Sequence, residues 1–314
     1  MKVVFQYDAS PQLSARLSEL STDGIEITPC PDRDTARFLD LMADADAVFH
    51  VLKPITAATI AHSPNLKLIQ KIGVGVNTID LEAAQARGIK VANMPGTNTR
   101  AVAETTLMLM LAALRRVHTY DEAMRRGAGW SLDAALFDSI GELGGRTVGL
   151  IGYGAVAQML TPMLLAMGAH VVYTARERKR ETLAEWRELS ELLADSDIVS
   201  LHLPLTETTA GMIDRAAISS MKNGAVFINT ARGGLVEEAA LIAALESGKL
   251  RAAGLDVFES EPVNPANSLL KLDNTIILPH IAWLTPETLE RSLGIALENC
   301  RCLLRGEEIR FRVV

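Results

Sequence analysis

The stretch VGLIGYGAVA, residues 148–157, joins an apolar run to a glycine-rich turn and the start of a helix. In this pattern Gly152 permits a tight turn, Gly154 lets a ligand approach the backbone, and Ala157 lets the helix pack closely on the strand. Amides at the helix start favour an anion such as a pyrophosphate. A glycine-rich turn alone is weak evidence, but the strand before it and the helix after it predict a dinucleotide-binding Rossmann domain.

The next strand ends at Thr174, where a site for NAD usually has an acidic residue that binds the ribose 2′-hydroxyl. Here Ala175 takes that place, Arg176 follows, and three further cations follow by residue 180. A small residue removes charge repulsion, and an arginine can bind a phosphate through two parallel hydrogen bonds. We therefore expect a preference for NADP(H), with NAD as the second choice; a solvated basic turn is the alternative interpretation.

Outward from this turn, β-branched runs alternate with helical patterns along the whole chain, which predicts parallel sheets with crossover helices. A first series has strands at 3–6, 25–28, 47–51, 66–72 and 89–92, with helices at 11–20, 35–43, 57–62 and 81–86. A second has strands at 148–151, 170–174, 198–201, 225–229, 252–255 and 275–278. One long helix is expected over 99–126 between the two series, and a final helix over 286–304.

Length and composition limit the function. The chain has 314 residues, enough for two domains, and 48% of them are hydrophobic. Its formal net charge of −7 argues against nucleic acid or an anionic membrane as a partner. No apolar run approaches the ~20 residues of a membrane span, and no His or Cys cluster has metal-ligand spacing. A protein without a metal is therefore expected. The three cysteines, Cys30, Cys300 and Cys302, form no disulfide framework, so a cytoplasmic location is expected.

Three charged side chains follow the ends of later strands. Arg232 follows the strand at 225–229, Glu261 follows the one at 252–255, and His280 follows the one at 275–278. Ligands of α/β sheets bind outside the carboxyl ends of the strands, so these side chains can meet over one crevice. A lone arginine or histidine is more often structural, and Glu259 competes with Glu261 as a partner for the histidine.

Several motifs in one order resemble the D-isomer-specific 2-hydroxyacid dehydrogenases. They are GVGVN at 73–77, AVAE at 101–104, the turn at 152–157, LHLPLT at 201–206, NTARGG at 229–234, GLDVFESEP at 254–262 and PHI at 279–281. The resemblance covers nearly the whole chain and implies an oxidoreductase. It implies that Arg232 binds the substrate carboxylate and polarises the C2 carbonyl, that His280 is the acid/base, and that Glu261 is its partner. Histidine, with an unperturbed pKa of about 6.5, suits proton transfer in both directions near neutrality.

Family position assigns further residues. The amides of Val74 and Gly75 are expected to bind the substrate carboxylate. The positions expected to touch the cofactor are Thr106, Gly152, Tyr153, Gly154, Ala155, Val156, Thr174, Ala175, Arg176, His202, Pro204, Thr209, Thr230, Ala231, Asp256 and His280. For His202 and Pro204 a plain strand-end turn is an alternative, and Asp256 could instead cap backbone amides.

The resemblance also implies a two-domain α/β architecture. A flavodoxin-like substrate domain would comprise residues 1–98 plus 286–314, and a doubly wound Rossmann NAD(P)-binding domain, residues 99–285, would be inserted in it. In the family the segment near Trp130 often belongs to a dimer arm, so a homodimer is expected; a buried intrachain tryptophan is the alternative.

The substrate class is inferred from one loop. Phosphoglycerate would call for cations after the third strand, where Val51 and Leu52 are followed by Lys53 as the only charge. A small 2-keto acid such as glyoxylate or hydroxypyruvate, reduced to the D-2-hydroxy acid, is therefore expected. Two alternatives remain: a formate- or phosphite-type dehydrogenase on the same fold, and a nicotinamide-sensing scaffold without significant turnover.

Overall fold

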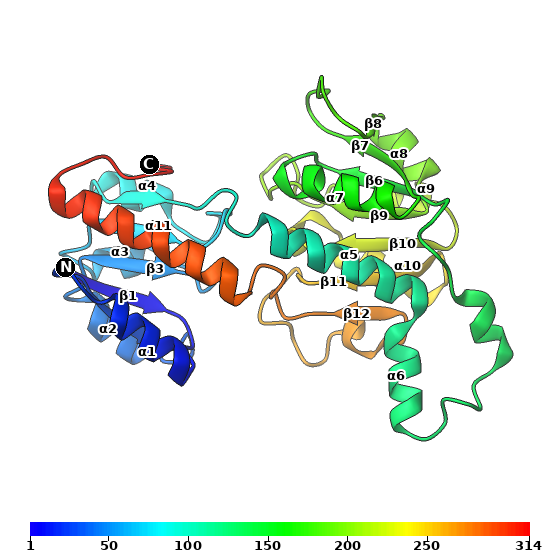
Figure 1. The fold of residues 1–314 in the computed structure, drawn as a ribbon, viewed down its shortest axis with the longest axis horizontal. Helices are drawn as coiled ribbons and strands as arrows, with labels where there is room; N and C mark the ends of the chain where they lie inside the picture. The colour runs from blue at the N-terminus through cyan, green and yellow to red at the C-terminus, as the bar shows by residue number, and fades with distance from the viewer. The chain divides into compact units, whose positions relative to one another are not determined.

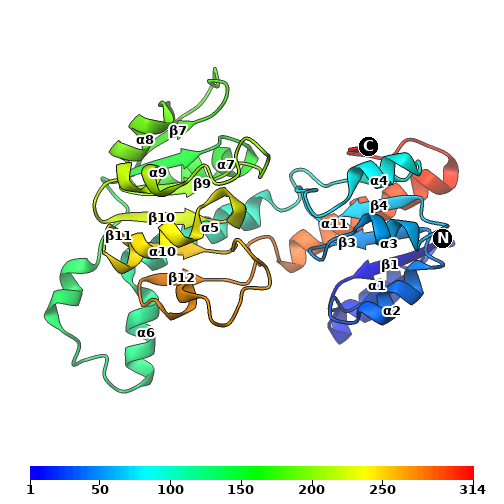
Figure 2. The same cartoon turned by 180° about the vertical axis from the view of Figure 1, so that it is seen from behind.

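The structure, a computed structural model, describes residues 1–314. It consists of two compact units, one formed by Met1–Asn98 with Thr285–Val314 and the other by Thr99–Leu284 (Figures 1 and 2). In sequence, the second unit is an insertion within the first. None of the helices combines the length and the apolarity that crossing a bilayer requires.

The first unit contains a sheet of five parallel strands in the order β2-β1-β3-β4-β5. The strands are β1 (Lys2–Gln6), β2 (Glu26–Cys30), β3 (Ala47–His50), β4 (Leu68–Lys71) and β5 (Lys90–Ala92). This is the flavodoxin-like order. Its helices are α1 (Pro11–Leu20), α2 (Thr35–Met42), α3 (Ala57–Ala61), α4 (Leu81–Ala86) and α11 (Pro286–Arg305).

Local sequence explains where these helices begin. Each of the five follows a Ser, Asp or Thr whose side-chain oxygen accepts an amide hydrogen bond from the first turn; the capping residues are Ser10, Asp34, Thr56, Asp80 and Thr285. The last helix ends at Gly306, which has a left-handed backbone with φ 72°.

The second unit contains seven parallel strands in the order β12-β11-β10-β9-β6-β7-β8. They are β6 (Thr147–Ile151), β7 (His170–Thr174), β8 (Glu185–Trp186), β9 (Ile198–Leu201), β10 (Ala225–Asn229), β11 (Leu250–Leu255) and β12 (Thr275–Ile277). Counted from β6, the first six strands have the order 3-2-1-4-5-6 of doubly wound dinucleotide-binding sheets. The predicted fold class is confirmed.

The helices of this unit are α5 (Thr99–Arg115), α6 (Val117–Arg125), α7 (Ala155–Ala166), α8 (Leu189–Asp195), α9 (Arg215–Ser220) and α10 (Glu238–Glu246). Three 3-10 helices accompany them: η1 (Ala134–Ser139), η2 (Gly233–Leu235) and η3 (Ser268–Lys271). Residues of α5 and α7 pack on one face of the sheet, and residues of α8, α9 and α10 pack on the other.

Two expectations about the elements were wrong. The helix over 99–126 is broken at Arg116, whose left-handed backbone (φ 51°) interrupts the hydrogen-bond ladder, and the amide of Gly141 instead bonds to Leu114 O at 2.9 Å. The strand β8 was not foreseen because its two residues are too short to show alternation.

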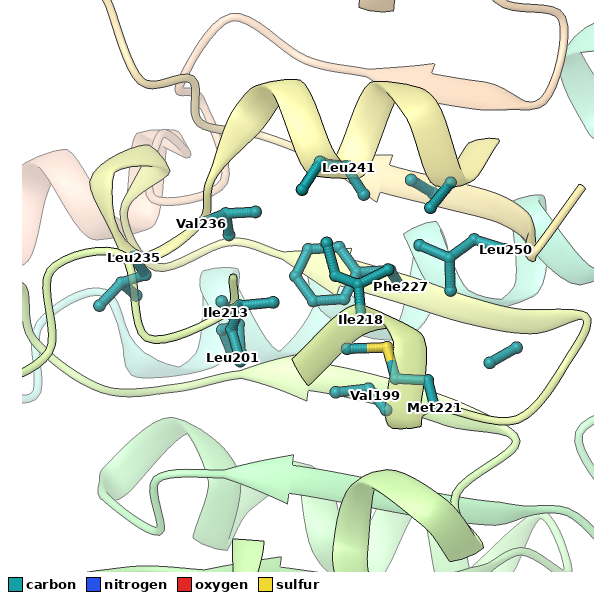
Figure 3. Packing of buried hydrophobic residues seen from close by; sticks show 14 of the residues in the cluster. Val199, Leu201, Ile213, Ile218, Met221, Phe227, Leu235, Val236, Leu241 and Leu250 are labelled. Atoms are coloured by element: carbon teal, nitrogen blue, oxygen red, sulfur yellow. The ribbon is translucent and has the colours of Figure 1, made fainter. Parts of the chain in front are cut away.

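A hydrophobic core fixes the position of the strand ends in the second unit. In Figure 3 the ring of Phe227, from β10, lies among Ile218 of α9, Leu241 of α10 and Val199 of β9. All four side chains are at most 3% exposed. Because close-packed interiors resist small displacements, the loops at the carboxyl ends of the strands start from a rigid platform.

The same substitution, glycine to alanine, is expected to have opposite effects in two places. At Gly254 in β11 an added Cβ would lie 2.9 Å from Leu109 Cβ and from Ile228 Cδ1, so Gly254→Ala should lower the free energy of unfolding by about 1–3 kcal/mol. At Gly294, exposed within α11, nothing lies within 4 Å, so Gly294→Ala should raise it by about 0.5–1 kcal/mol. Urea unfolding followed by circular dichroism measures both. A Gly254→Ala protein as stable as the parent would contradict the tight packing of α5 on β11.

Candidate active site

The two glycines of the turn after β6 serve different purposes. Gly152 has φ +92°, and a Cβ there would lie 2.4 Å from His202 O, so the fold itself requires glycine. Gly154 has φ −82°, and a Cβ there would meet nothing within 4 Å. The fold therefore does not need glycine at 154, and the open space lies at the N-terminus of α7, where a pyrophosphate is favoured. Together with the amides of Ala155 and Val156, this turn fits a dinucleotide.

Other expected cofactor positions lie around the same edge of the sheet. The Oγ1 atoms of Thr106 and Thr230 are 2.8 Å apart, so these two buried residues join α5 to the end of β10. Thr174 and Ala175 are half-buried at the end of β7, and Arg176 is exposed. The side chain of Tyr153 is buried, so only its backbone belongs to the turn surface.

The loop after β9 is held by its own side chains. The Nε2 atom of His202 lies 2.9 Å from Ser200 Oγ, and burial lowers the pKa of His202 to about 4. The imidazole is therefore neutral at physiological pH. Thr209 Oγ1 donates to Pro204 O at 2.8 Å and accepts from the amide of Thr206 at 2.8 Å. Both predicted residues, Pro204 and Thr209, thus belong to one hydrogen-bonded turn.

Asn229 shapes the turn that carries Arg232. Its Oδ1 accepts from the amide of Ala231 at 3.0 Å, and its Nδ2 donates to Arg232 O at 2.9 Å. A Cβ at the next residue, Gly233, would lie 1.9 Å from Phe258 O, so only glycine permits this approach of the two backbones. Asn229 is not among the residues expected from the sequence to form the site, although an Asn between a strand and a Gly-Gly pair is typical of a side-chain-capped turn.

Arg232 lies close to Glu261. Its Nη1 donates to Ala231 O at 2.6 Å. Burial lowers the pKa of Arg232 below its ordinary value, and the charge of Glu261 opposes that shift. An arginine stays protonated in proteins, so the site contains a largely desolvated cation suited to a carboxylate.

Glu261 and His280 form a hydrogen-bonded pair. Glu261 Oε2 lies 2.6 Å from His280 Nδ1, and Glu261 Oε1 accepts from the amide of Phe258 at 3.0 Å. Burial alone would raise the pKa of Glu261, but the hydrogen bond and charge of His280, the Phe258 amide and the charge of Arg232 together hold it below its ordinary value. The carboxylate fixes the imidazole through Nδ1, which leaves Nε2 for proton exchange with a ligand.

Asp256 positions the histidine through the backbone. Its two carboxylate oxygens accept from the amides of Ile281 and Ala282 at 2.8 and 2.9 Å, and Asp256 O accepts from the amide of His280 at 2.8 Å. His280 itself has φ +57°, a left-handed conformation that costs free energy in a non-glycine residue. Asp256 is 1% exposed. The capping role weighed for Asp256 is therefore the one its carboxylate fulfils.

Val74 and Gly75 belong to the other unit, in the loop after β4. The amide of Met94 donates to Gly73 O at 2.8 Å, and Asn93 Nδ2 donates to Val74 O at 2.9 Å. These bonds fix the carbonyl groups of the loop, and Val74 is 45% exposed.

A buried polar group in the same unit was missed. Lys71 is 4% exposed and its Nζ donates to Val51 O, at the start of the loop in which Lys53 is the only charged residue expected from the sequence. Burial, with the charge of Lys71, holds the pKa of His50 well below its ordinary value. Lys71 lies within the apolar run of β4, but its acceptor, Val51 O, belongs to a segment twenty residues earlier, so this contact could not be read from the sequence.

The pKa of Glu261 provides a test of the pair. In the unfolded chain a glutamate titrates near pH ~4.3, so a lower folded-state pKa stabilises the protein above that pH, and this stabilisation is lost as pH falls through the folded-state value. In His280→Gln the pKa of Glu261 should rise, because the hydrogen bond and charge of His280, the largest effects that oppose burial, are removed. Carboxyl ¹³C NMR measures the shift, with His170→Gln at the exposed start of β7 as control. An unchanged titration of Glu261 in His280→Gln would show that the histidine is not its main partner.

Comparison with known proteins gives a consistent result. The family described as "D-isomer specific 2-hydroxyacid dehydrogenase, NAD binding domain" matches residues 107–282. Glyoxylate reductase from Aeropyrum pernix is 39% identical over 272 residues, which cover 84% of this chain and 81% of that protein. D-3-phosphoglycerate dehydrogenase from Mycobacterium leprae is 37% identical over 290 residues, which cover 91% of this chain and 54% of that protein. The chain thus spans about half the length of this second relative.

Among solved structures, TT0316 protein from Thermus thermophilus has a TM-score of 0.90 and 37% identity, with both chains covered completely. The family match includes the dinucleotide turn, Arg232, Glu261 and His280. The chain therefore belongs to the D-isomer specific 2-hydroxyacid dehydrogenase family of nicotinamide-dependent oxidoreductases.

Proposed function

We propose that this protein is an NADP(H)-preferring reductase that converts a small 2-keto acid, such as glyoxylate or hydroxypyruvate, to the D-2-hydroxy acid. The observation that carries the proposal is the pair of Glu261 Oε2 and His280 Nδ1, 2.6 Å apart, near the half-buried cation Arg232. An acid/base, its orienting carboxylate and a carboxylate-binding cation are the groups that this reaction needs.

The proposed chemistry assigns one task to each side chain. Arg232 binds the substrate carboxylate and polarises the carbonyl at C2. When bound, a reduced nicotinamide supplies the hydride, which adds to C2 while the carbonyl electron pair moves to oxygen. His280 Nε2 gives its proton to that oxygen, and Glu261 stabilises the imidazolium through Nδ1. In the reverse direction the neutral imidazole takes the proton back.

The two units receive different roles in this proposal. The unit formed by residues 1–98 and 285–314 is assigned to the substrate, whose carboxylate would be bound by the amides of Val74 and Gly75. The unit of residues 99–284 is assigned to the cofactor. The amides of Val74 and Gly75 donate to no acceptor within the unit, so both are available to an outside acceptor.

The hydrogen bonds of Lys53 favour a substrate whose group at C3 is small and uncharged. Its Nζ donates to Asp32 O at 2.7 Å and to Thr35 Oγ1 at 2.6 Å, so the one cation of that loop is already used within the unit. The similarity to the glyoxylate reductase of Aeropyrum pernix agrees with this choice. The similarity to D-3-phosphoglycerate dehydrogenase makes phosphoglycerate the first competitor to include in an assay.

The enzymatic proposal is tested by turnover. Purified protein with glyoxylate or hydroxypyruvate should oxidise NADPH with a higher kcat/KM than NADH. His280→Ala should lower kcat about 10²–10⁴-fold, the usual contribution of a general acid/base to the rate. Arg176→Ala should lower kcat/KM for NADPH about tenfold or more, because a charge-assisted hydrogen bond is lost, and leave NADH unchanged. Lys271→Ala, an exposed lysine in η3, is the control. Tight cofactor binding without turnover of any keto acid would favour a nicotinamide-sensing scaffold instead.

We also propose a homodimer formed through residues 117–140. This segment exposes Val117 (51%), Met124 (51%), Trp130 (91%) and Phe137 (56%) within a short stretch of chain. Several exposed apolar side chains on one segment are typical of an interface, and a tryptophan is a common anchor. A cytoplasmic location is proposed as well, supported by the three unpaired, buried cysteines.

Light scattering tests the dimer. The parent protein should have twice the mass of its chain, and Trp130→Ser should shift it toward monomer, whereas Leu304→Ser, an equally simple change at an exposed leucine of α11, should not. A monomeric parent at micromolar concentration would contradict the proposal.

A further inference from the structure

The segment 175–184, here called the basic loop, carries the proposed 2′-phosphate site and contains no helix or strand. It connects the parallel neighbours β7 and β8, and Figure 1 shows it as a loop that projects beyond both. Its four cations, Arg176, Arg178, Lys179 and Arg180, are all exposed. Ordering a mobile loop on binding costs free energy, so such a site binds a phosphate well only if its backbone is already held in place.

Tyr173 holds the middle of this loop. It is the penultimate residue of β7, its side chain is completely buried, and its hydroxyl accepts from the amide of Lys179 at 2.8 Å. The centre of the basic run is therefore bonded to the interior of the sheet, although its charged groups are in solvent.

Tyr153 holds the far end of the loop. It stands between Gly152 and Gly154 in the turn after β6, here called the pyrophosphate turn, and is 6% exposed. Its hydroxyl accepts from Thr182 Oγ1 at 2.6 Å, and Thr182 Oγ1 in turn accepts from the amide of Ala184 at 3.1 Å. One residue thus belongs to the pyrophosphate turn through its backbone and to the basic loop through its side chain.

The protons of these hydroxyl groups can be assigned. Thr161 Oγ1 uses its only proton on Ala157 O at 2.8 Å, so Tyr153 must be the donor to Thr161 Oγ1, 3.1 Å away. Tyr153 then has a lone pair for Thr182, whose proton it accepts. Each of these hydroxyl groups gives one proton and accepts one hydrogen bond, so the network has a single direction.

The two rings make one unit. Tyr153 and Tyr173 stack with ring centroids 4.1 Å apart and an interplanar angle of 30°. A core that needed only apolar volume would be served by phenylalanine at both positions. The hydroxyl of Tyr173 bonds to the loop, and that of Tyr153 bonds to the loop and to α7.

We propose that Tyr153 and Tyr173 are positioning residues that set nucleotide specificity, by fixing the basic loop relative to the pyrophosphate turn so that it receives the 2′-phosphate. The inference rests on the proposed preference for NADP(H). In this proposal neither side chain touches the 2′-phosphate. Tyr173 acts through the backbone of the loop, at Lys179, and Tyr153 acts through a side chain of the loop, that of Thr182.

The experiment compares two probes that differ in one phosphate, 2′,5′-ADP and 5′-AMP, by calorimetry on the full chain. Tyr173→Phe and Tyr153→Phe should each raise the Kd for 2′,5′-ADP roughly three- to tenfold, the size expected from the loss of one hydrogen bond, and Tyr173→Phe should leave the Kd for 5′-AMP unchanged. In turnover of Tyr173→Phe, KM for NADPH should rise with kcat preserved. Tyr120→Phe is the matched control, because the buried Tyr120 hydroxyl has no hydrogen-bond partner.

Thr182 allows the same test without a change in the core. Thr182→Val removes the donor to Tyr153 and should weaken 2′,5′-ADP binding by a similar factor, and Thr182→Ser, which keeps the hydroxyl, should restore it. The result thus holds even if a tyrosine variant folds poorly.

The outcomes separate the two proposals. If the parent protein binds 2′,5′-ADP no more tightly than 5′-AMP, the NADP(H) preference is wrong and this inference falls with it. If the parent prefers 2′,5′-ADP but the Phe and Val variants keep the same ratio of the two affinities, only the positioning role is overturned. Equal weakening of both probes also overturns it, because that is the signature of general structural damage.

Discussion

The carboxylate of Asp256 is the interaction on which the candidate active site depends. It is buried, and burial raises its pKa, while the amides of Ala282 and Ile281 act against that shift by stabilising the charge. The same bonds hold the segment that follows β12 in the turn where His280 adopts a left-handed backbone. The local cost of that conformation is offset by two bonds to a charged acceptor, which are among the stronger hydrogen bonds in proteins. The side chain that exchanges protons in the proposed reaction is therefore placed by a neighbouring strand, not by its own.

Close approaches of backbone to backbone complete the arrangement. Gly233 lets the Arg232 turn lie against Phe258, at the start of the turn that leads to Glu261, and Gly152 lets the pyrophosphate turn lie against His202. In both places a single methyl group would overlap a main-chain atom. The relative positions of Arg232, Glu261 and His280 thus follow from main-chain contacts between the loops at the carboxyl ends of the strands of one sheet. Their charges then stabilise one another: His280 and Arg232 favour the ionised form of Glu261, and Glu261 favours the charged form of the half-buried Arg232.

Most of the fold could be predicted because its information is local. Parallel strands buried on both faces appear as short apolar runs, and capping residues such as Ser10 and Asp34 stand directly before the first residue of a helix. The strand ends that carry Arg232, Glu261 and His280 could be found for the same reason. The break at Arg116 could not, because a left-handed arginine has no sequence signal, and β8 could not, because two residues have no period. The partners of Tyr153, Tyr173 and Lys71 also escaped prediction, since they depend on contacts between segments that are distant in sequence or separated by an irregular loop.

The loop between β7 and β8 has a consequence for how this chain can change over generations. Between Ala175 and Leu183 no side chain is fully buried, so replacements there meet solvent and leave the packing of the sheet as it is. The residues that surround His280, in contrast, are held by buried bonds and by glycines that tolerate no substitution without movement. A change in the proposed choice of nucleotide therefore needs no repacking of the sheet, whereas a change around His280 needs movement of main-chain atoms.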